Sequence, residues 1–242
     1  MIRLFVASDL SADRPVGLER AQSHYLVDVM RLAEGAEIAV FNGRDGEWLA
    51  KLTRRSKLGW ALVPTVLARA QRPGPDLDLL VALIRRSRLE TVVEKAAELG
   101  ARRVRLVITE RANPARANLQ RLTAIATEAA EQTGRMDVPE ILAPESLADV
   151  LAAWDGERRL MFCDEAGEAP MAIEALVDCP PAVSWAILIG PEGGFSASER
   201  GRIRATPGAL LAGLGPRILR SDTAAICAMT LWQAQWGDWR GT

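Results

Sequence analysis

The chain has 242 residues, enough for one large domain or two modest ones, each with a hydrophobic core. Its 49% apolar and 25% charged residues are typical of a globular protein, and no apolar run approaches the roughly 20 residues that span a membrane. The first residues lack a signal-peptide pattern, so we expect a cytoplasmic protein. Three cysteines without metal-like spacing and a single histidine, His24, argue against a zinc site and predict a reduced protein without a metal or disulfide.

The net charge of −1 hides an uneven distribution of charge along the chain. Residues 1–135 carry 22 Lys and Arg against 16 Asp and Glu, whereas residues 136–242 carry 8 against 15. Basic side chains cluster within residues 51–57, 85–88 and 102–105. Such clusters suit a partner with a phosphate backbone, and they are equally typical of solvated helix surfaces. Charge therefore suggests nucleic acid as a partner without establishing it.

Residues 1–72 have the pattern of a small β domain. We predict strands at residues 3–6 and 59–68, and a hairpin over residues 36–52. The hairpin prediction rests on the sequence NGRDG at residues 42–46, because Asn-Gly and Asp-Gly both favour tight turns between antiparallel strands. The segment from 69 to 78, which contains the sequence PGP, is the predicted linker to the rest of the chain.

Residues 73–242 alternate strands with helices. Apolar strands are predicted at residues 77–84, 103–109, 159–165, 185–190 and 209–215. Helices are predicted at residues 87–100, 118–134 and 221–236, the first two ended by Gly100 and Gly134. A capping box of Ser196 and Glu199 starts a further helix. This alternation predicts an α/β domain with a mostly parallel sheet that helices cover on both faces.

Three of these predicted strands end in unusual loops, with the sequences FCDEAG at 162–167, GPEGG at 190–194 and GLGPRILR at 213–220. Ligands bind beyond the carboxyl ends of strands in open α/β sheets. Glycine lets the backbone approach a ligand closely, and a Gly-Pro pair fixes a specific bend. The loops predict a rigid pocket lined by main-chain groups, with tight structural turns as the alternative.

Several common catalytic motifs are missing from these loops. None matches the dinucleotide pattern GxGxxG, which disfavours a nucleotide-dependent oxidoreductase, and none is a GxxxxGK[ST] phosphate loop. The chain also lacks a GxSxG nucleophile elbow. The residues alone therefore predict a pocket without identifying its ligand.

The stretches LIGPEGGFSASE and LGPRILRSDTAA resemble the signature of the bacterial 16S ribosomal RNA (uracil-N3)-methyltransferases, which belong to the SPOUT class of knotted methyltransferases. Three further stretches resemble the same family: VEKAAELGARRVRLVITERA, EAAEQTGRMDVPEI and HYLVDVMRLAEGAEIAVFNG. The resemblance covers nearly the whole chain. It implies a PUA-like β-barrel RNA-binding domain at residues 1–72, and a SPOUT-type α/β methyltransferase domain with a carboxyl-terminal trefoil knot at residues 73–242.

The same resemblance implies S-adenosylmethionine-dependent methylation of N3 of a specific uridine in the 16S ribosomal RNA of the small ribosomal subunit. The three loops are then expected to surround the cofactor. The implied cofactor-binding residues are Cys163, Asp164, Glu165, Leu188, Ile189, Gly190, Pro191, Gly193, Gly194, Leu214, Gly215, Ile218 and Leu219.

Methylation of a uracil N3 requires loss of its proton and stabilisation of charge on the flanking carbonyl oxygens. Arg220 suits the second task because its guanidinium stays charged, although it can instead pair with Asp222 or cap a helix. Glu192 and Thr223 complete the predicted catalytic set. Glu192 can instead accept hydrogen bonds from its own loop, and Thr223 can merely cap the last helix. Asp222 stands where the family more commonly has Glu, which weakens a role for it as the base.

Contact with RNA is expected from arginines in both parts of the chain, and each of them can also be an ordinary surface residue. The predicted RNA-binding residues are Arg3, Arg31, Arg85, Arg86, Arg111 and Arg135. The last predicted helix carries an apolar stripe, which predicts either a homodimer interface or burial within one chain. The stripe consists of Ile226, Met229, Trp232 and Trp236, and the family resemblance favours the homodimer.

Two alternatives to this function remain open at the level of sequence. The first is a knotted methyltransferase that acts on another RNA, at a tRNA base or a ribose 2′-hydroxyl. The second is a non-catalytic RNA-binding assembly factor that keeps the cofactor fold. Binding of the cofactor without methyl transfer would identify the second alternative.

Overall fold

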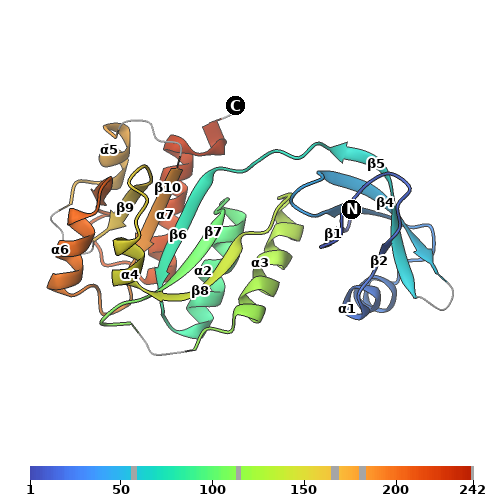
Figure 1. Cartoon of the computed structure of the whole chain (residues 1–242), viewed down its shortest axis with the longest axis horizontal. Coiled ribbons are helices and arrows are strands. Elements are labelled where there is room, and N and C mark those ends of the chain that lie inside the picture. Colours follow the sequence, from blue (N-terminus) through green and yellow to red (C-terminus); the bar gives the residue numbers. More distant parts are fainter. Residues whose placement is uncertain (56–58, 113–115, 165–168, 180–183, 241–242) are drawn as a thin grey trace. The chain divides into compact units, whose positions relative to one another are not determined.

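A computed structural model of the protein describes residues 1–55, 59–112, 116–164, 169–179 and 184–240 (Figure 1). The chain divides into two compact units. The first comprises residues 1–73 with 130–138, and the second comprises residues 74–129 with 139–242. The division after residue 73 falls inside the predicted linker. Residues 130–138 belong to the first unit although they lie within the sequence expected for the second domain.

The first unit is built on a five-stranded sheet with the order β1-β3-β4-β5-β2. β1 runs parallel to β3, and the other pairs are antiparallel. Alternate side chains of these strands point to one face and form a core that includes Leu4, Ile38, Val40 and Leu52. This is the β domain that the sequence predicts. Its strands are β1 (Arg3–Phe5), β2 (Val16–Gly17), β3 (Glu37–Phe41), β4 (Glu47–Arg54) and β5 (Trp60–Arg69).

The predicted hairpin is confirmed as β3 and β4, and Asn42 shapes its turn. The side-chain oxygen of Asn42 accepts hydrogen bonds from the backbone N–H groups of Arg44 and Asp45, at 3.0 and 2.8 Å. Gly43 and Gly46 have φ values of 80° and 83°, a region that glycine enters without steric penalty. The turn residues therefore set the hairpin locally.

A helical segment between β2 and β3 was not predicted. Helix α1 (Arg20–Ser23) continues directly into a six-residue π-helix, η1 (His24–Val29). The wider π turn is visible in the hydrogen bond of 2.9 Å from Met30 N–H to the carbonyl of Tyr25. Leu26 is fully buried in the core of the first unit. The neighbouring apolar side chains of Tyr25 and Val29 are exposed, so the segment lacks the clean apolar stripe from which a helix is recognised.

The second unit is built on a six-stranded sheet with the order β11-β9-β10-β6-β7-β8. All of its strand pairs are parallel, as the α/β alternation predicts. β8 was not predicted, because it is an edge strand that contains Pro144 and buries few side chains. The strands are β6 (Asp76–Ala82), β7 (Arg103–Ile108), β8 (Glu140–Ser146), β9 (Arg159–Cys163), β10 (Ser184–Ile189) and β11 (Ala209–Ala212).

Helices connect these strands. Gly100 and Gly134 follow α2 and α3 with φ values of 82° and 79°, which confirms both as helix-ending glycines. None of the helices in the described part of the chain combines the length and the apolar character that crossing a bilayer requires. The helices are α2 (Arg86–Glu98), α3 (Leu119–Thr133), α4 (Leu147–Ala152), α5 (Ala172–Val177), α6 (Ala197–Ala205) and α7 (Ser221–Trp236), followed by the short 3₁₀-helix η3 (Asp238–Arg240).

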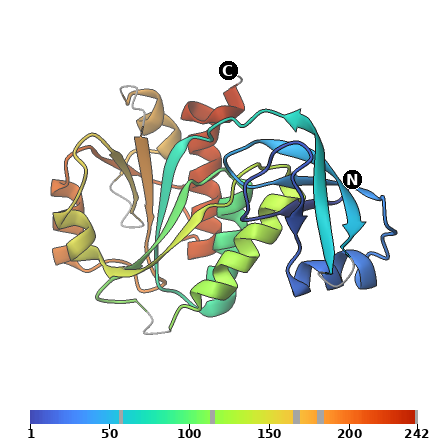
Figure 2. The same cartoon turned by 45° about the vertical axis from the view of Figure 1, so that its right-hand side comes forward.

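Helices cover both faces of the six-stranded sheet, and the alternation of side chains along β10 separates two cores. Ala186 and Leu188 point into a cluster that α4 and α6 complete. Trp185 points to the other face, where its ring lies 6.4 Å from the rings of both Trp232 and Trp236 of α7. Figure 2 shows α2 beside α7 on that face. The central strand is therefore buried on both sides.

A network of charges ties the amino ends of the central strands together. Asp78 is fully buried, and its carboxylate accepts a hydrogen bond of 2.7 Å from Arg103 of β7. Arg158 binds both carboxylate oxygens of Asp76 at 3.0 Å and donates to the carbonyl of Trp185 at 2.8 Å. These contacts join β6, β7 and β10 to the residue before β9. This edge of the sheet therefore carries a structural network.

Candidate functional site

The loops after β9, β10 and β11 lie at the opposite, carboxyl edge of the sheet. Because the strands are parallel and stand in the order β11-β9-β10-β6, these three strand ends are neighbours. The predicted cofactor segments are these same three loops, as far as they are described. The fold thus gathers at one edge segments that are up to fifty residues apart in the sequence.

The loop at 190–194 has a fixed shape that depends on glycine. A β-carbon at Gly190 would lie 2.7 Å from the ring of Phe195, which is fully buried and packs edge-on against Phe162 of β9. Gly194 has a φ of 64°, and its N–H donates to the carbonyl of the buried Pro191 at 2.9 Å. The shape of this loop therefore requires glycine at 190 and favours it at 194.

The start of α7 is attached to this loop. The hydroxyl of buried Ser221 donates a hydrogen bond of 2.8 Å to the carbonyl of Gly190. Arg220 is the N-cap residue of α7 and is exposed, and no carboxylate within the described ranges forms an ion pair with its guanidinium. The Asp222 carboxylate accepts from the N–H of exposed Thr223 at 3.0 Å. Arg220 therefore does not pair with Asp222, and although it occupies the N-cap position, its side chain makes no capping hydrogen bond.

Glu192, the predicted acid of the loop, is paired with α2. Its carboxylate lies 3.2 Å from the guanidinium of Arg88, a residue that the sequence reasoning missed. Arg111 donates to the carbonyl of Gly193 at 3.1 Å. Arg88 and Arg111 therefore both contact the loop at 190–194. The only sequence signal for Arg88 was its place in the basic cluster at 85–88. Its partner could not be read from the sequence, because it lies 104 residues away.

The loop after β11 is held to the segment that follows β9. Gly213 N–H donates to the carbonyl of Pro170 at 2.7 Å, and Ala172 N–H donates to the carbonyl of Gly213 at 2.9 Å. Gly215 has a φ of 115°, and a β-carbon there would meet no atom within 4 Å. Leu214 and Leu219 are half-buried. Ile218 is 83% exposed, so this loop leaves apolar side chains accessible at the edge of the sheet.

At the end of β9, the Cys163 thiol is buried, and burial raises its pKa well above the ordinary value. The buried carboxylate of Asp164 lies 3.2 Å from both Arg200 and Arg204 of α6. The side chain of Asp164 is therefore directed to α6, and only its main chain lies at the carboxyl edge of the sheet. Glu165 lies outside the described residues. Within the described ranges, no three His, Cys, Asp or Glu side chains are grouped to hold a metal ion.

The capping box predicted at the start of α6 is confirmed. The Ser196 hydroxyl accepts from Glu199 N–H at 3.1 Å, and the Glu199 carboxylate accepts from Ser196 N–H at 2.9 Å. The second oxygen of Glu199 accepts from Glu110 N–H at 2.8 Å, a contact that the sequence did not reveal. Glu199 therefore joins the loop after β10 to the segment after β7.

Two of the predicted RNA contacts, Arg3 and Arg135, form structural contacts within the first unit. Arg3 donates to Glu47 at 2.6 Å and to the carbonyls of residues 130, 131 and 135 at 2.7–2.9 Å, and its side chain is 13% exposed. Burial alone would raise the pKa of Glu47, but hydrogen bonds from Arg69 and Arg3 outweigh it and lower that pKa. Arg135 pairs with Asp137 at 2.7 Å. These contacts and the low exposure of both side chains, 13% and 11%, show a structural role, and contact of either arginine with RNA stays a prediction.

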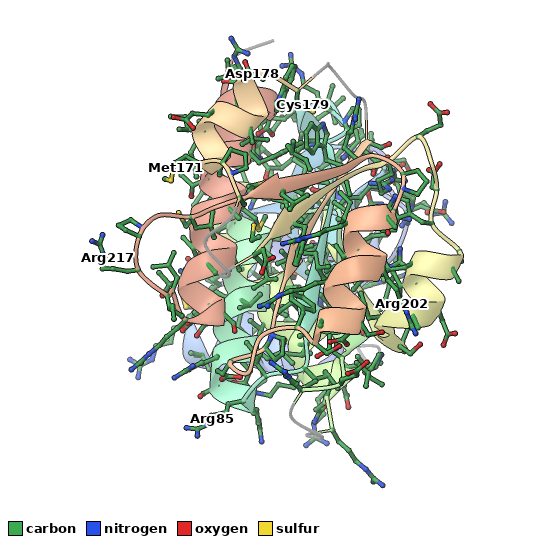
Figure 3. All side chains as sticks on the ribbon, turned by 90° about the vertical axis from the view of Figure 1, so that its left-hand side faces the viewer. Arg85, Met171, Asp178, Cys179, Arg202 and Arg217 are labelled. Carbon is green, nitrogen blue, oxygen red and sulfur yellow. The ribbon has the colours of Figure 1, made fainter. Side chains whose placement is uncertain are left out.

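The other predicted RNA contacts, Arg31, Arg85, Arg86 and Arg111, are exposed. Arg31 has a φ of 54°, which is uncommon for a residue with a β-carbon. Figure 3 shows Arg85 at the start of α2, with its side chain directed outward. These four arginines can reach a partner, and their contact with RNA stays a prediction.

The apolar stripe of α7 is used largely within the chain. Met229 and Trp232 are 1% and 2% exposed, and the indole N–H of Trp236 donates to the carbonyl of Leu176 at 3.0 Å. Contacts within the chain therefore account for Trp236 without a partner chain. The homodimer stays a prediction from the family resemblance.

Two family models match the chain. The one described as RNA methyltransferase domain matches residues 71–233, about two-thirds of the chain. The one described as RNA methyltransferase PUA domain matches residues 18–59. The two matches fall mainly on the second and the first unit, respectively.

Curated relatives and solved structures agree with these matches. The chain is 32% identical to ribosomal RNA small subunit methyltransferase E of Synechocystis, over 94% of this chain and 75% of that protein. The crystal structure of the protein of that name from Neisseria gonorrhoeae, bound to S-adenosylmethionine, is 27% identical, with a TM-score of 0.86 over 98% of this chain and 99% of that one. A putative methyltransferase from Legionella pneumophila, also with bound S-adenosylmethionine, is 28% identical, with a TM-score of 0.86 over 98% of both chains.

Proposed function

This chain belongs to the ribosomal RNA small subunit methyltransferase E family, and we propose that it transfers a methyl group from S-adenosylmethionine to N3 of one uridine in 16S ribosomal RNA. Family membership supports the enzyme class and its cofactor, and the resemblance of the two glycine loops to the uracil-N3 signature supports the position. A ribosomal substrate also supports a location in the cytoplasm. The homodimer and the trefoil knot that the resemblance implies belong to the same proposal.

The observation that carries the proposal is the attachment of α7 to the loop at 190–194. The bond from Ser221 to Gly190 fixes the exposed Arg220 next to an edge made of main-chain groups. That edge fits S-adenosylmethionine, because Gly190 has no room for a side chain and Gly215 leaves open space beside its main chain. The residues that we expect to hold the cofactor there are those of the loops at 188–194 and 214–219, with Cys163 and Asp164.

When bound, S-adenosylmethionine supplies an activated methyl group on a sulfonium centre. The chain must then orient the uracil and manage the charge that develops as N3 loses its proton. We propose that Arg220 stabilises this developing charge. Its guanidinium has no carboxylate partner in the described part of the chain, and an arginine is a lasting cation. Thr223, an exposed residue in the first turn of α7, is the second residue that we expect to contact the base, through a hydrogen bond.

Glu192 fits the role of a base less well than the sequence suggested. Its carboxylate lies 3.2 Å from the guanidinium of Arg88, and this ion pair directs it toward α2. We therefore propose that Glu192 holds the loop against α2. The N3 proton then passes to solvent water, and Arg220 assists its loss by stabilising the charge that develops on the flanking carbonyl oxygens.

The test uses small ribosomal subunits from a bacterium that lacks this methylation. Incubation with the protein and methyl-labelled S-adenosylmethionine is expected to label the RNA and to create one new reverse-transcription stop, because an N3-methyl group blocks the pairing edge. Arg220→Ala is expected to lower the rate about a hundredfold to a thousandfold, the range for loss of one charge-stabilising group, with unchanged cofactor affinity. Arg202→Ala, an exposed arginine of α6, is the matched control and is expected to keep full activity.

Three other outcomes would contradict parts of this proposal. Label without a stop would place the methyl group on a ribose or another base position. Label on tRNA but not on the subunit would replace the ribosomal substrate. Cofactor binding without transfer to any RNA would identify a non-catalytic assembly factor.

A further inference from the structure

A pocket lies between the starts of α2 and α3, away from the three cofactor loops. Its floor is apolar and is made by side chains such as Ile84 and Leu89, which are 1% and 4% exposed. Its rim is polar and basic. The lining residues are Ile84, Arg86, Leu89, Glu90, Arg116, Ala117, Asn118, Arg121 and Leu122.

The rim carries more positive than negative charge. Three arginines and one glutamate line the pocket, which leaves a net charge of two positive. Glu90 accepts hydrogen bonds from Arg86 at 2.8 Å and from Arg121 at 3.1 Å, and these bonds, Arg121 first, hold the pKa of Glu90 below its ordinary value. Among the described residues, no carboxylate pairs with Arg116. The pocket therefore has two exposed arginines that share Glu90 as their partner, and a third cation, Arg116.

Both helices begin without the acidic residues that usually stabilise a helix start. α2 opens with Arg86-Ser87-Arg88, and neither its first turn nor that of α3 contains an acid. By contrast, α4 and α6 have Asp149 and Glu199 in their first turns. The positive ends of two helix dipoles thus add to the arginine charge at this pocket. An anion bound there would relieve this excess.

The pocket stands on the same edge of the sheet as the proposed methyl-transfer site. Ile84 follows the carboxyl end of β6, the neighbour of β10. Arg86 and Arg88 are two residues apart on α2, so their side chains leave the helix in different directions. Arg86 lines the pocket, whereas Arg88 pairs with Glu192 in the loop at 190–194. One turn of helix therefore connects the pocket with the cofactor loop.

We propose that this pocket binds one phosphate group of the substrate RNA backbone through Arg86, Arg116 and Arg121. The inference rests on the proposed function for the identity of the ligand. Planar guanidiniums on two helices match the oxygens of a phosphate. A phosphate held there fixes the path of the RNA strand relative to Arg220. Arg116 and Arg121 thereby add two RNA-binding residues that the sequence did not single out.

The test measures equilibrium binding of the full chain to small ribosomal subunits at several salt concentrations, without turnover. Arg116→Gln is expected to weaken binding about fivefold to tenfold near physiological salt, and to reduce the log–log salt slope by about one, the value for one lost phosphate contact. Arg121→Gln is expected to give the same change of slope. Arg202→Gln removes an equal charge from α6, on the other face of the sheet, and is expected to leave the slope unchanged (Figure 3).

A slope for Arg116→Gln equal to that of Arg202→Gln would overturn the proposal, because the effect would then be one of general charge. The proposal would also be overturned if a free mononucleotide competed for this pocket while neither Arg116→Gln nor Arg121→Gln changed RNA binding. That result would indicate a nucleotide site. The proposed reaction can fail independently: a chain that binds RNA through this pocket but never methylates it would contradict only the proposed function.

Discussion

Gly190 is the residue whose substitution tests the shape of the cofactor loop most directly. An added β-carbon would lie 2.7 Å from the Phe195 ring, which is locked between β9 and α6. Gly190→Ala is expected to destabilise the protein by about 1–3 kcal/mol, the usual range for overpacking, and to weaken S-adenosylmethionine binding. Urea unfolding and calorimetric titration measure the two effects.

Two controls make the Gly190 result specific. Gly201 lies within α6, and a β-carbon there would meet no atom within 4 Å, so Gly201→Ala is expected to stabilise the protein by about 0.5–1 kcal/mol. In a Phe195→Leu background, Gly190→Ala should cost less than in the natural chain, because the two side chains would no longer collide. Equal costs in both backgrounds would show that the ring is not the obstacle.

At the scale of elements, Glu199 couples helix α6 to the segment after β7. Its two carboxylate oxygens accept from Ser196 N–H and Glu110 N–H, and the residue is 6% exposed. Glu199→Ala is expected to cost about 2–6 kcal/mol, since it leaves two backbone donors with no acceptor at about 1–3 kcal/mol each. Glu199→Gln keeps one acceptor oxygen, so its loss of unfolding free energy should be smaller than that of Glu199→Ala. Ser198→Ala, an exposed change in the same helix, should leave the urea midpoint unchanged.

Elements set by local chemistry could be predicted from the sequence. Gly100 and Gly134 mark the helix ends, and Asn42 sets the hairpin turn. The π-helix η1 was missed because its wider turn gives no 3.6-residue pattern. The site followed the same rule: the loops were found from their glycines, whereas the pairing of Glu192 with Arg88 depends on a contact across 104 residues. The structural contacts of Arg3 were missed for the same reason, since the three carbonyl groups that it binds lie more than 120 residues away.

At the scale of the whole molecule, the amino and carboxyl ends of the strands in the six-stranded sheet have different roles. The amino edge carries the buried network of Asp76, Asp78, Arg103 and Arg158, and the carboxyl edge carries the proposed site. Arg158→Ala is expected to lower the unfolding free energy by about 3–5 kcal/mol, because it removes one cation beside the fully buried Asp78 carboxylate and both hydrogen bonds to the carboxylate of the partly buried Asp76. Cofactor affinity of the folded fraction should stay unchanged.

Arg102 provides the comparison for this prediction. It pairs with the same Asp76 at 3.2 Å, but its side chain is 58% exposed. Arg102→Ala should therefore cost only about 0–1 kcal/mol, the range for surface ion pairs. Equal losses for both variants in urea unfolding would mean that burial does not determine the strength of this network.

The order of strands in the sheet has a consequence for how the chain is made. β10 inserts between β6 and β9, so the central place beside β6 stays vacant until residue 189 has been synthesised, 107 residues after β6 ends at Ala82. At about 5–20 residues per second, a nascent chain carries this open strand edge for about 5–20 s. Unpaired apolar edges are the usual templates for aggregation. Expression at reduced temperature or with added chaperones should therefore increase the yield of folded protein more than it would for a chain whose neighbouring strands follow one another.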